Sequence, residues 1–220
     1  MINMNRNNIF RLDKSSEFED GPFKRIFSMI SPREGWDTYI LVLAMVGVAA
    51  WIVREAEWVE TPGLWLIIFL STIVGLGTAK TKIFPWPVSL ATGILIGLII
   101  SIWQTSTLII EQNALGAFRE VINHVIVWFE VARSDEINRD LIPPTLYLLF
   151  LAWLLGYVST WFLFRFSNVW IGILLSGIAI LTTLSFMPDY FLDGFYLFLM
   201  IAFVVVGRLT VVQRHDKWNS

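Results

Sequence analysis

Cysteine is absent from the 220-residue sequence, which excludes disulfides, thiolate metal ligands and a cysteine nucleophile. Histidine occurs only at His124 and His215, and the topology predicted below puts these two residues on opposite sides of a membrane, where they cannot share a metal ion. The serine and threonine residues have no histidine or lysine partner in their sequence context. We therefore expect no catalytic residue, no cofactor and no metal site in this chain.

Charged residues are also scarce. They make up 15% of the chain, against about 25% in a typical soluble domain, and they gather in clusters between long uncharged runs, as segments that cross hydrocarbon require. Hydrophobic residues reach 56%, with eleven Trp and seventeen Phe, and Trp is enriched at membrane interfaces. The net charge of −2 gives no reason to expect a nucleic-acid partner. The sequence predicts a multi-pass membrane protein whose partner is the lipid bilayer.

Six uncharged runs predict the fold, an all-α polytopic membrane helical bundle with about six transmembrane helices. The runs cover residues 38–53, 61–79, 83–110, 141–164, 166–188 and 194–207. A spanning helix needs roughly 17–25 mostly apolar residues, so the first and last runs are short. They become long enough if their flanking charges lie at the headgroup level, namely Asp37, Arg54, Asp193 and Arg208.

The expected six-helix transmembrane domain covers residues 37–212, between an N-terminal tail of residues 1–36 and a C-terminal end of residues 213–220. The tail has no apolar segment of the length of a cleavable signal peptide. Residues 22–30, which are basic and aromatic, either rest on the membrane surface or belong to a disordered leader.

Basic residues set the expected orientation, because Lys and Arg accumulate in short cytoplasmic loops. With the N-terminus inside, twelve of the sixteen basic residues fall in the tail, the second and fourth loops and the C-terminal end. The four outside are Arg54, Arg119, Arg133 and Arg139. We expect a protein of the cell (inner or plasma) membrane with both termini cytoplasmic.

The one long external loop, residues 107–140, contains an amphipathic pattern. Apolar residues recur at helical spacing, at Leu115, Phe118, Ile122, Val125, Ile126 and Phe129. This predicts an interfacial helix from about residue 113 to residue 132, lying flat on the outer leaflet. The polar residues Arg119, Glu120, Asn123 and Glu130 fall elsewhere on the helical wheel and form a candidate external docking surface.

Four glycines in the predicted spans are candidate helix-packing positions. Gly93 and Gly97 form a GxxxG motif, which lets a second helix backbone approach closely. Gly156 and Gly172 lie in the fourth and fifth predicted spans, and we assign them the same role. The motif serves either a dimer face or packing within the bundle, and a polytopic bundle favours the second use.

Several stretches resemble the N-terminal membrane region of the TgpA-type transglutaminase-like proteins of bacteria, over about residues 31–218. They are Pro32-Arg-Glu-Gly-Trp36, Ala56-Glu-Trp58-Val, the Trp128 segment with the Ser134-Asp135 turn, Trp153-Leu-Leu-Gly156-Tyr157-Val-Ser-Thr-Trp161-Phe-Leu-Phe-Arg165, and the ending Arg208-Leu-Thr-Val-Val-Gln-Arg214-His-Asp-Lys-Trp218. The resemblance implies that a further membrane helix follows, and then an extracytoplasmic transglutaminase-like domain with a Cys–His–Asp triad. This chain has no cysteine, so no catalytic residue is carried over.

The resemblance implies a non-catalytic membrane module that anchors or regulates an extracytoplasmic transglutaminase- or peptidase-like domain absent from this chain, with that domain as a partner in cis or in trans. The alternative is a small membrane transporter or channel. Ion-coupled transporters nearly always keep a titratable residue deep in a span, and none lies deep in these runs. That observation favours the anchoring module without excluding transport through backbone carbonyls and hydroxyls.

Overall fold

The computed structural model describes residues 35–81, 85–109, 113–134, 140–186 and 192–218, and in these ranges it contains seven helices and no strand. The helices are α2 (Trp36–Glu55), α3 (Leu64–Lys80), α4 (Trp86–Ser106), α5 (Ala114–Ala132), α6 (Ile142–Phe166), α7 (Trp170–Leu184) and α8 (Leu192–Trp218). The predicted all-α helical bundle is confirmed. Residues 1–34 of the predicted tail, residues 135–139 and the last two residues lie outside the described ranges, as do the side chains of residues 212–218.

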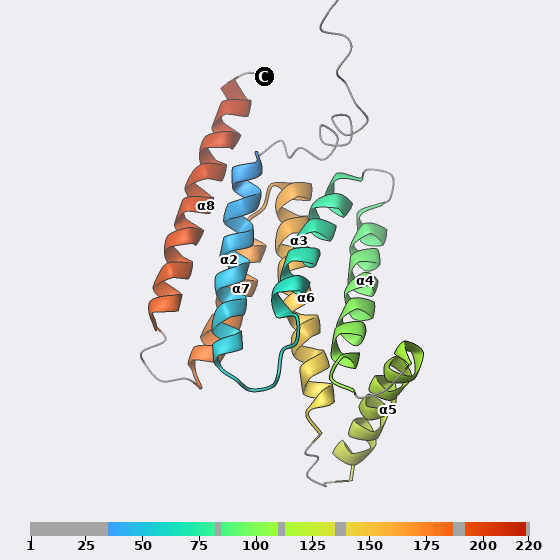
Figure 1. Ribbon diagram of the computed structural model, residues 1–220. Coiled ribbons are helices and arrows are strands. Elements are labelled where there is room, and N and C mark those ends of the chain that lie inside the picture. Colours follow the sequence, from blue (N-terminus) through green and yellow to red (C-terminus); the bar gives the residue numbers. More distant parts are fainter. Residues whose placement is uncertain (1–34, 82–84, 110–112, 135–139, 187–191, 219–220) are drawn as a thin grey trace, which may run out of the picture. The chain divides into compact units, whose positions relative to one another are not determined.

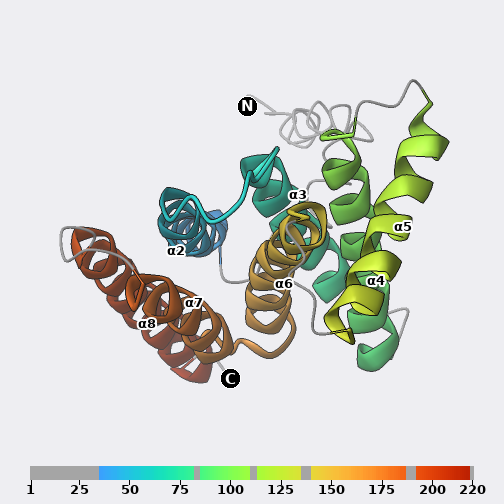
Figure 2. The same ribbon diagram turned by 90° about the horizontal axis from the view of Figure 1, so that it is seen from below.

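Helices α2, α3, α4, α6, α7 and α8 run alternately up and down, so that consecutive members are antiparallel (Figure 1). The most extensive contact joins α3 to α6. Seen along the bundle, α2, α7 and α8 lie on one side of this pair, and α4 and α5 lie on the other (Figure 2). The start of α2 and the end of α8 are at one end of the bundle, and α5 is at the other (Figure 1).

The distribution of polarity is that of a protein surrounded by hydrocarbon. All the polar residues that are buried among the described ones are serines or threonines, eleven in number. Large apolar side chains face outward on several helices instead, for example Leu95, Leu174 and Phe203, the last of which is 76% exposed. Helices in a bilayer associate through small and hydroxyl-bearing residues because lipid is as apolar as leucine. The protein is therefore a membrane protein.

Helix length supports four of the predicted spans directly. α2, α4, α6 and α8 are long and apolar enough to cross a membrane, whereas α3 has 17 residues and α7 has 15. At 1.5 Å per residue, α3 and α7 measure about 25 Å and 22 Å, against a hydrocarbon core about 30 Å thick. By length and composition, the described residues therefore contain four helices able to span a membrane and two shorter apolar helices, and not the full count of six.

The two runs expected to be short did lengthen through their charged ends. α2 includes Asp37 and Arg54, and α8 includes Asp193 and Arg208. At one end of the bundle Arg208 Nη2 lies 2.7 Å from Asp37 Oδ2, and Arg208 Nε donates to Thr38 Oγ1 at 3.1 Å. The pairing joins the last helix to the first, and it offsets the cost of holding both charges close to the apolar region.

Candidate functional site

Among the described helices, α5 is the most strongly amphipathic. It contacts the last part of α4 and the first part of α6 (Figures 1 and 2). Its bounds, Ala114–Ala132, agree within one residue with those expected from the apolar spacing. Among the side chains of α5 that the structure describes, Ala117 and Val121 are buried, the second with no exposed surface.

Three stripes run along α5 when its residues are placed about 100° apart around the helix axis. The bundle-facing stripe consists of Ala117, Val121, Val125 and Trp128. The polar stripe, on the opposite side, consists of Arg119, Asn123 and Glu130, all exposed. Between them lies an uncovered apolar stripe formed by Leu115, Ile122, Ile126 and Phe129, whose exposed fractions range from 40% to 86%.

This arrangement refines the expected apolar face. The contact with the bundle is made by one edge of the apolar surface, centred on Val121, and not by Ile122 or Phe129. The expected apolar face did not include Ala117 and Val121, although small side chains allow the closest approach between helices. The polar residues assigned to the docking surface share one face, except that Glu120 is half-buried and turned toward His124.

A polar contact also joins α5 to α6. His124 Nδ1 lies 2.6 Å from Asp140 Oδ2, and His124 Nε2 lies 3.7 Å from Glu120 Oε1. The other carboxylate oxygen of Asp140 accepts a hydrogen bond from the backbone N–H of Ile142, the first residue of α6, at 3.0 Å. His124, which the sequence analysis considered only as a possible metal ligand, thus connects α5 to Asp140, and Asp140 in turn binds the first residue of α6.

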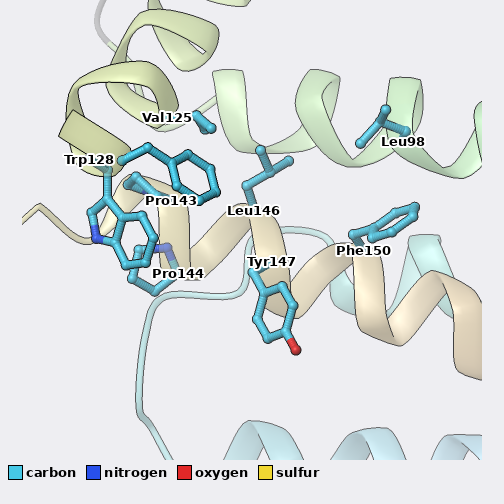
Figure 3. A pocket seen from close by; sticks show the side chains of 9 residues that line it. Leu98, Val125, Trp128, Pro143, Pro144, Leu146, Tyr147 and Phe150 are labelled. Carbon is cyan, nitrogen blue, oxygen red and sulfur yellow. The ribbon is translucent and has the colours of Figure 1, made fainter. Parts of the chain in front are cut away.

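An apolar groove of about 510 Å³ lies between α4, α5 and α6 (Figure 3). Its lining side chains are Leu98, Val125, Trp128, Phe129, Pro143, Pro144, Leu146, Tyr147 and Phe150. The lining surface is apolar throughout. In Figure 3 the Tyr147 hydroxyl and the Trp128 indole nitrogen both point away from the other labelled side chains.

The four packing glycines lie at contacts between helices of the same chain. A Cβ at Gly93 would overlap the Tyr157 ring, and one at Gly97 would overlap the Trp153 indole. A Cβ at Gly156 would overlap Ser71 Oγ of α3, and one at Gly172 would lie 2.9 Å from Ser159 Cβ of α6. The GxxxG face of α4 is therefore occupied by α6, which takes the place that a second copy would need.

Three aromatic residues one turn apart on α6 complete the contact between α4 and α6. The sequence analysis assigned them no role in helix packing. Trp153, Tyr157 and Trp161 have no exposed surface. The Trp153 indole N–H donates to Gly93 O at 3.0 Å, and the Tyr157 hydroxyl donates to Ser89 O at 2.8 Å. The Trp161 indole N–H donates to Ser89 Oγ at 3.1 Å, and that hydroxyl donates onward to Thr78 O of α3 at 3.0 Å. Each polar aromatic atom thus has a partner inside the bundle, which fixes the position of α4 against α6.

Within the described ranges no three His, Cys, Asp or Glu side chains come together in a way that could hold a metal ion. Comparisons with protein-family models, with curated proteins and with solved structures give no match. The fold and the α5 region define a multi-helix membrane protein with one amphipathic helix held against one end of its bundle.

Proposed function

We propose that this chain is a non-catalytic membrane module that anchors an extracytoplasmic transglutaminase- or peptidase-like domain, and that α5 is the surface on which this domain rests. The observation that carries the proposal is the three-stripe organisation of α5. A helix that is fixed to the bundle on one side and polar on the opposite side supplies a rigid platform directed away from the membrane core.

The attachment of α5 supports a platform rather than a loose loop. Val121 is fully buried and Ala117 nearly so, while the contact of His124 with Asp140 joins α5 to the first turn of α6. Docking onto an ordered surface costs less conformational entropy than docking onto a flexible segment.

The charges of the polar stripe suit a specific partner. Arg119 and Glu130 lie eleven residues apart on one face, which corresponds to about 16 Å along the helix. A partner with an acidic group opposite Arg119 and a basic group opposite Glu130 would match the stripe in one direction only. Complementary charges at exposed positions of this kind favour orientation and association rate more than affinity.

The proposal includes an orientation in the cell (inner or plasma) membrane, with both termini cytoplasmic and α5 outside. It is supported by the uneven distribution of basic residues along the sequence. The alternating directions of the helices, with the α8 end and the α2 start at the end of the bundle opposite α5 (Figure 1), are compatible with it.

Reporter fusions test this orientation. A reporter that is active only in the cytoplasm should be active after Ser220 and inactive when inserted near Asn138, and a reporter that is active only outside should give the reverse pattern. Fusions within the first tail residues provide a matched control for the cytoplasmic side. If the Asn138 and Ser220 fusions report the same side, the proposed orientation is wrong.

Site-specific crosslinking tests the platform. A photoreactive residue at Asn123 in the polar stripe should capture the extracytoplasmic domain in cells, while the same residue at Ile126 in the uncovered apolar stripe should not. Because this chain has no cysteine, an alkylating thiol probe on the adduct identifies a partner that carries a reactive cysteine. The charge reversals Arg119→Glu and Glu130→Lys should weaken capture from Asn123 about tenfold, the effect of roughly 1.4 kcal/mol.

Two results would contradict the platform. One is the lack of any thiol-labelled adduct from Asn123 when expression and membrane insertion of the variant are normal. The other is equal capture from Asn123 and Ile126, because a partner that contacts both stripes is not resting on the polar one.

A further inference from the structure

The α4–α5–α6 groove has dimensions that match one leaflet of a bilayer. Leu98 lies eight residues before the end of α4, and Phe150 lies eight residues after the start of α6. Both positions are therefore about 12 Å from the end of the bundle at which α5 lies. Half of a hydrocarbon core is about 15 Å thick, so the length of the groove along the helices is comparable with the thickness of one leaflet.

The groove also opens onto exposed apolar surface of the bundle. Phe129, Leu98 and Tyr147 line it and are 57%, 40% and 64% exposed. They are continuous with the uncovered apolar stripe of α5 and with exposed apolar residues of α4 such as Leu95 and Ile99. A lipid chain reaches the groove by lateral movement in the membrane, without crossing polar surface.

We propose that the α4–α5–α6 groove binds one hydrocarbon chain of a lipid from the membrane leaflet on the α5 side. The lining offers no polar group, whereas an extended peptide brings backbone N–H and C=O groups that need partners in a membrane. Nine lining residues are also few beside the roughly 20–30 residues per side of a stable protein interface. A volume of about 510 Å³ lies in the usual range of small-molecule pockets, about 300–1,000 Å³.

The bound chain has a structural consequence for α5. Val125 and Trp128 of α5 face Pro143, Pro144 and Leu146 of α6 across the groove. A hydrocarbon chain between these residues completes the packing that Ala117 and Val121 begin further along the same helix. The lipid thereby supports the bundle-facing stripe of α5. This inference requires only that the protein lies in a membrane, and it holds whether or not a domain docks on the polar stripe.

The test uses the full chain in phospholipid vesicles that contain a small fraction of phosphatidylcholine with a photoreactive diazirine in the middle of one acyl chain. Adducts are mapped by mass spectrometry. At low probe content, adducts at the groove residues should exceed those at Leu174 of α7, which is 61% exposed and does not line this groove.

Substitutions at the groove make the test specific. Leu146→Trp fills the groove, and Leu174→Trp is the matched control on an exposed face. Filling the groove should lower the groove adducts to the level found at Leu174 of the unchanged protein, while adducts on α7 stay unchanged in both variants. Val125→Phe, which fills the groove from α5, should repeat the result if Leu146→Trp fails to fold.

Three outcomes would overturn the proposal. The first is groove labelling that does not exceed labelling at Leu174. The second is labelling that neither filling variant lowers. The third is a disulfide between cysteines introduced at the groove residues of two copies of the chain. A protein segment would then occupy the groove.

Discussion

Gly97→Ala is expected to separate α4 from α6 and to lower the free energy of unfolding by about 1–3 kcal/mol, the usual cost of overpacking a rigid site. A methyl group at this position overlaps the Trp153 indole, which has no exposed surface and whose N–H donates to Gly93 O at 3.0 Å. The indole cannot move aside without losing this hydrogen bond, worth about 0.6 kcal/mol on average inside a membrane. Reversible unfolding of the full chain in detergent, followed by tryptophan fluorescence, measures the change.

Gly93→Ala should behave in the same way through Tyr157, whose hydroxyl donates to Ser89 O at 2.8 Å. Gly77→Ala and Gly207→Ala are the matched controls, because a Cβ at either helical position meets nothing within 4 Å. In water, alanine is favoured over glycine inside a helix by about 0.8–1.0 kcal/mol, so these controls should be neutral or slightly stabilising.

Trp153→Leu should partly rescue Gly97→Ala, since the smaller side chain leaves room for the new methyl group. The coupling in this double-mutant cycle attributes the loss to the pair of residues. Gly97→Ala with the same stability as Gly77→Ala would show that α4 does not pack on α6 through the GxxxG face.

α3 and α7 are shorter than the uncharged runs in which they lie. Residues 61–79 and 166–188 are long enough as runs, but α3 and α7 within them have only 17 and 15 residues. α3 starts only after Gly63, which has a left-handed backbone with φ of 59° next to the Gln104 side chain, and α7 ends at Leu184. The left-handed backbone at Gly63 accounts for the start of α3, whereas charge spacing reports only where hydrocarbon contact is tolerated.

α2 and α8 are longer than the two short uncharged runs in which they were expected, residues 38–53 and 194–207. α2 and α8 continue through Asp37, Arg54, Asp193 and Arg208 because charge does not interrupt backbone hydrogen bonding in a helix. The sequence analysis placed these charges at the headgroup level and Arg54 outside the membrane, whereas the structure shows only that all four residues belong to the helices. The specific partner of Arg208, which is 171 positions away at Asp37, depends on which helices become neighbours, and the sequence pattern does not contain that information.

The same limit applies to the candidate site. The spacing of apolar residues predicted the bounds of α5 and the grouping of Arg119, Asn123 and Glu130, because both depend on local helix geometry. The division of its apolar surface into a bundle-facing stripe and an uncovered one depends on α4 and α6, so it could not be predicted. The contact of His124 with Asp140 is equally non-local, and no pattern in the sequence connects these two residues.

The uncovered apolar stripe leads to the second large expected effect, a sharp division of labelling along α5. Single cysteines are unique labels in a chain that has none. Under the proposed orientation, a membrane-impermeant thiol reagent applied outside should label cysteines at Arg119, Glu120, Asn123 and Glu130. Cysteines at Phe118, Ile122 and Phe129 should be protected, as should one at Val121.

The physical reason for protection differs between these positions. Val121 has no exposed surface, so the bundle alone protects it. Ile122 and Phe129 are 40% and 57% exposed, so they are protected only if a membrane covers them. Each remaining apolar side chain of the stripe contributes about 1.5–3 kcal/mol when it is buried in hydrocarbon. These side chains keep α5 at the interface, so the cysteine among them should react with the aqueous reagent about tenfold more slowly or less. The polar stripe remains in water, because Arg119 alone would cost about 2.5–3.5 kcal/mol at the bilayer centre.

Spin labels on the same cysteines separate the two kinds of protection. At Ile122 and Phe129 the label should collide often with oxygen, which dissolves in hydrocarbon, and rarely with a water-soluble nickel chelate. At Val121 it should meet neither, and at Asn123 it should meet the chelate. Equal thiol labelling of Ile122, Phe129 and Asn123 would mean that no membrane covers the uncovered apolar stripe. α5 would then not lie in the membrane interface, and the bundle alone would hold it through Ala117, Val121 and the contact of His124 with Asp140. A platform that rests on the membrane surface would then be wrong.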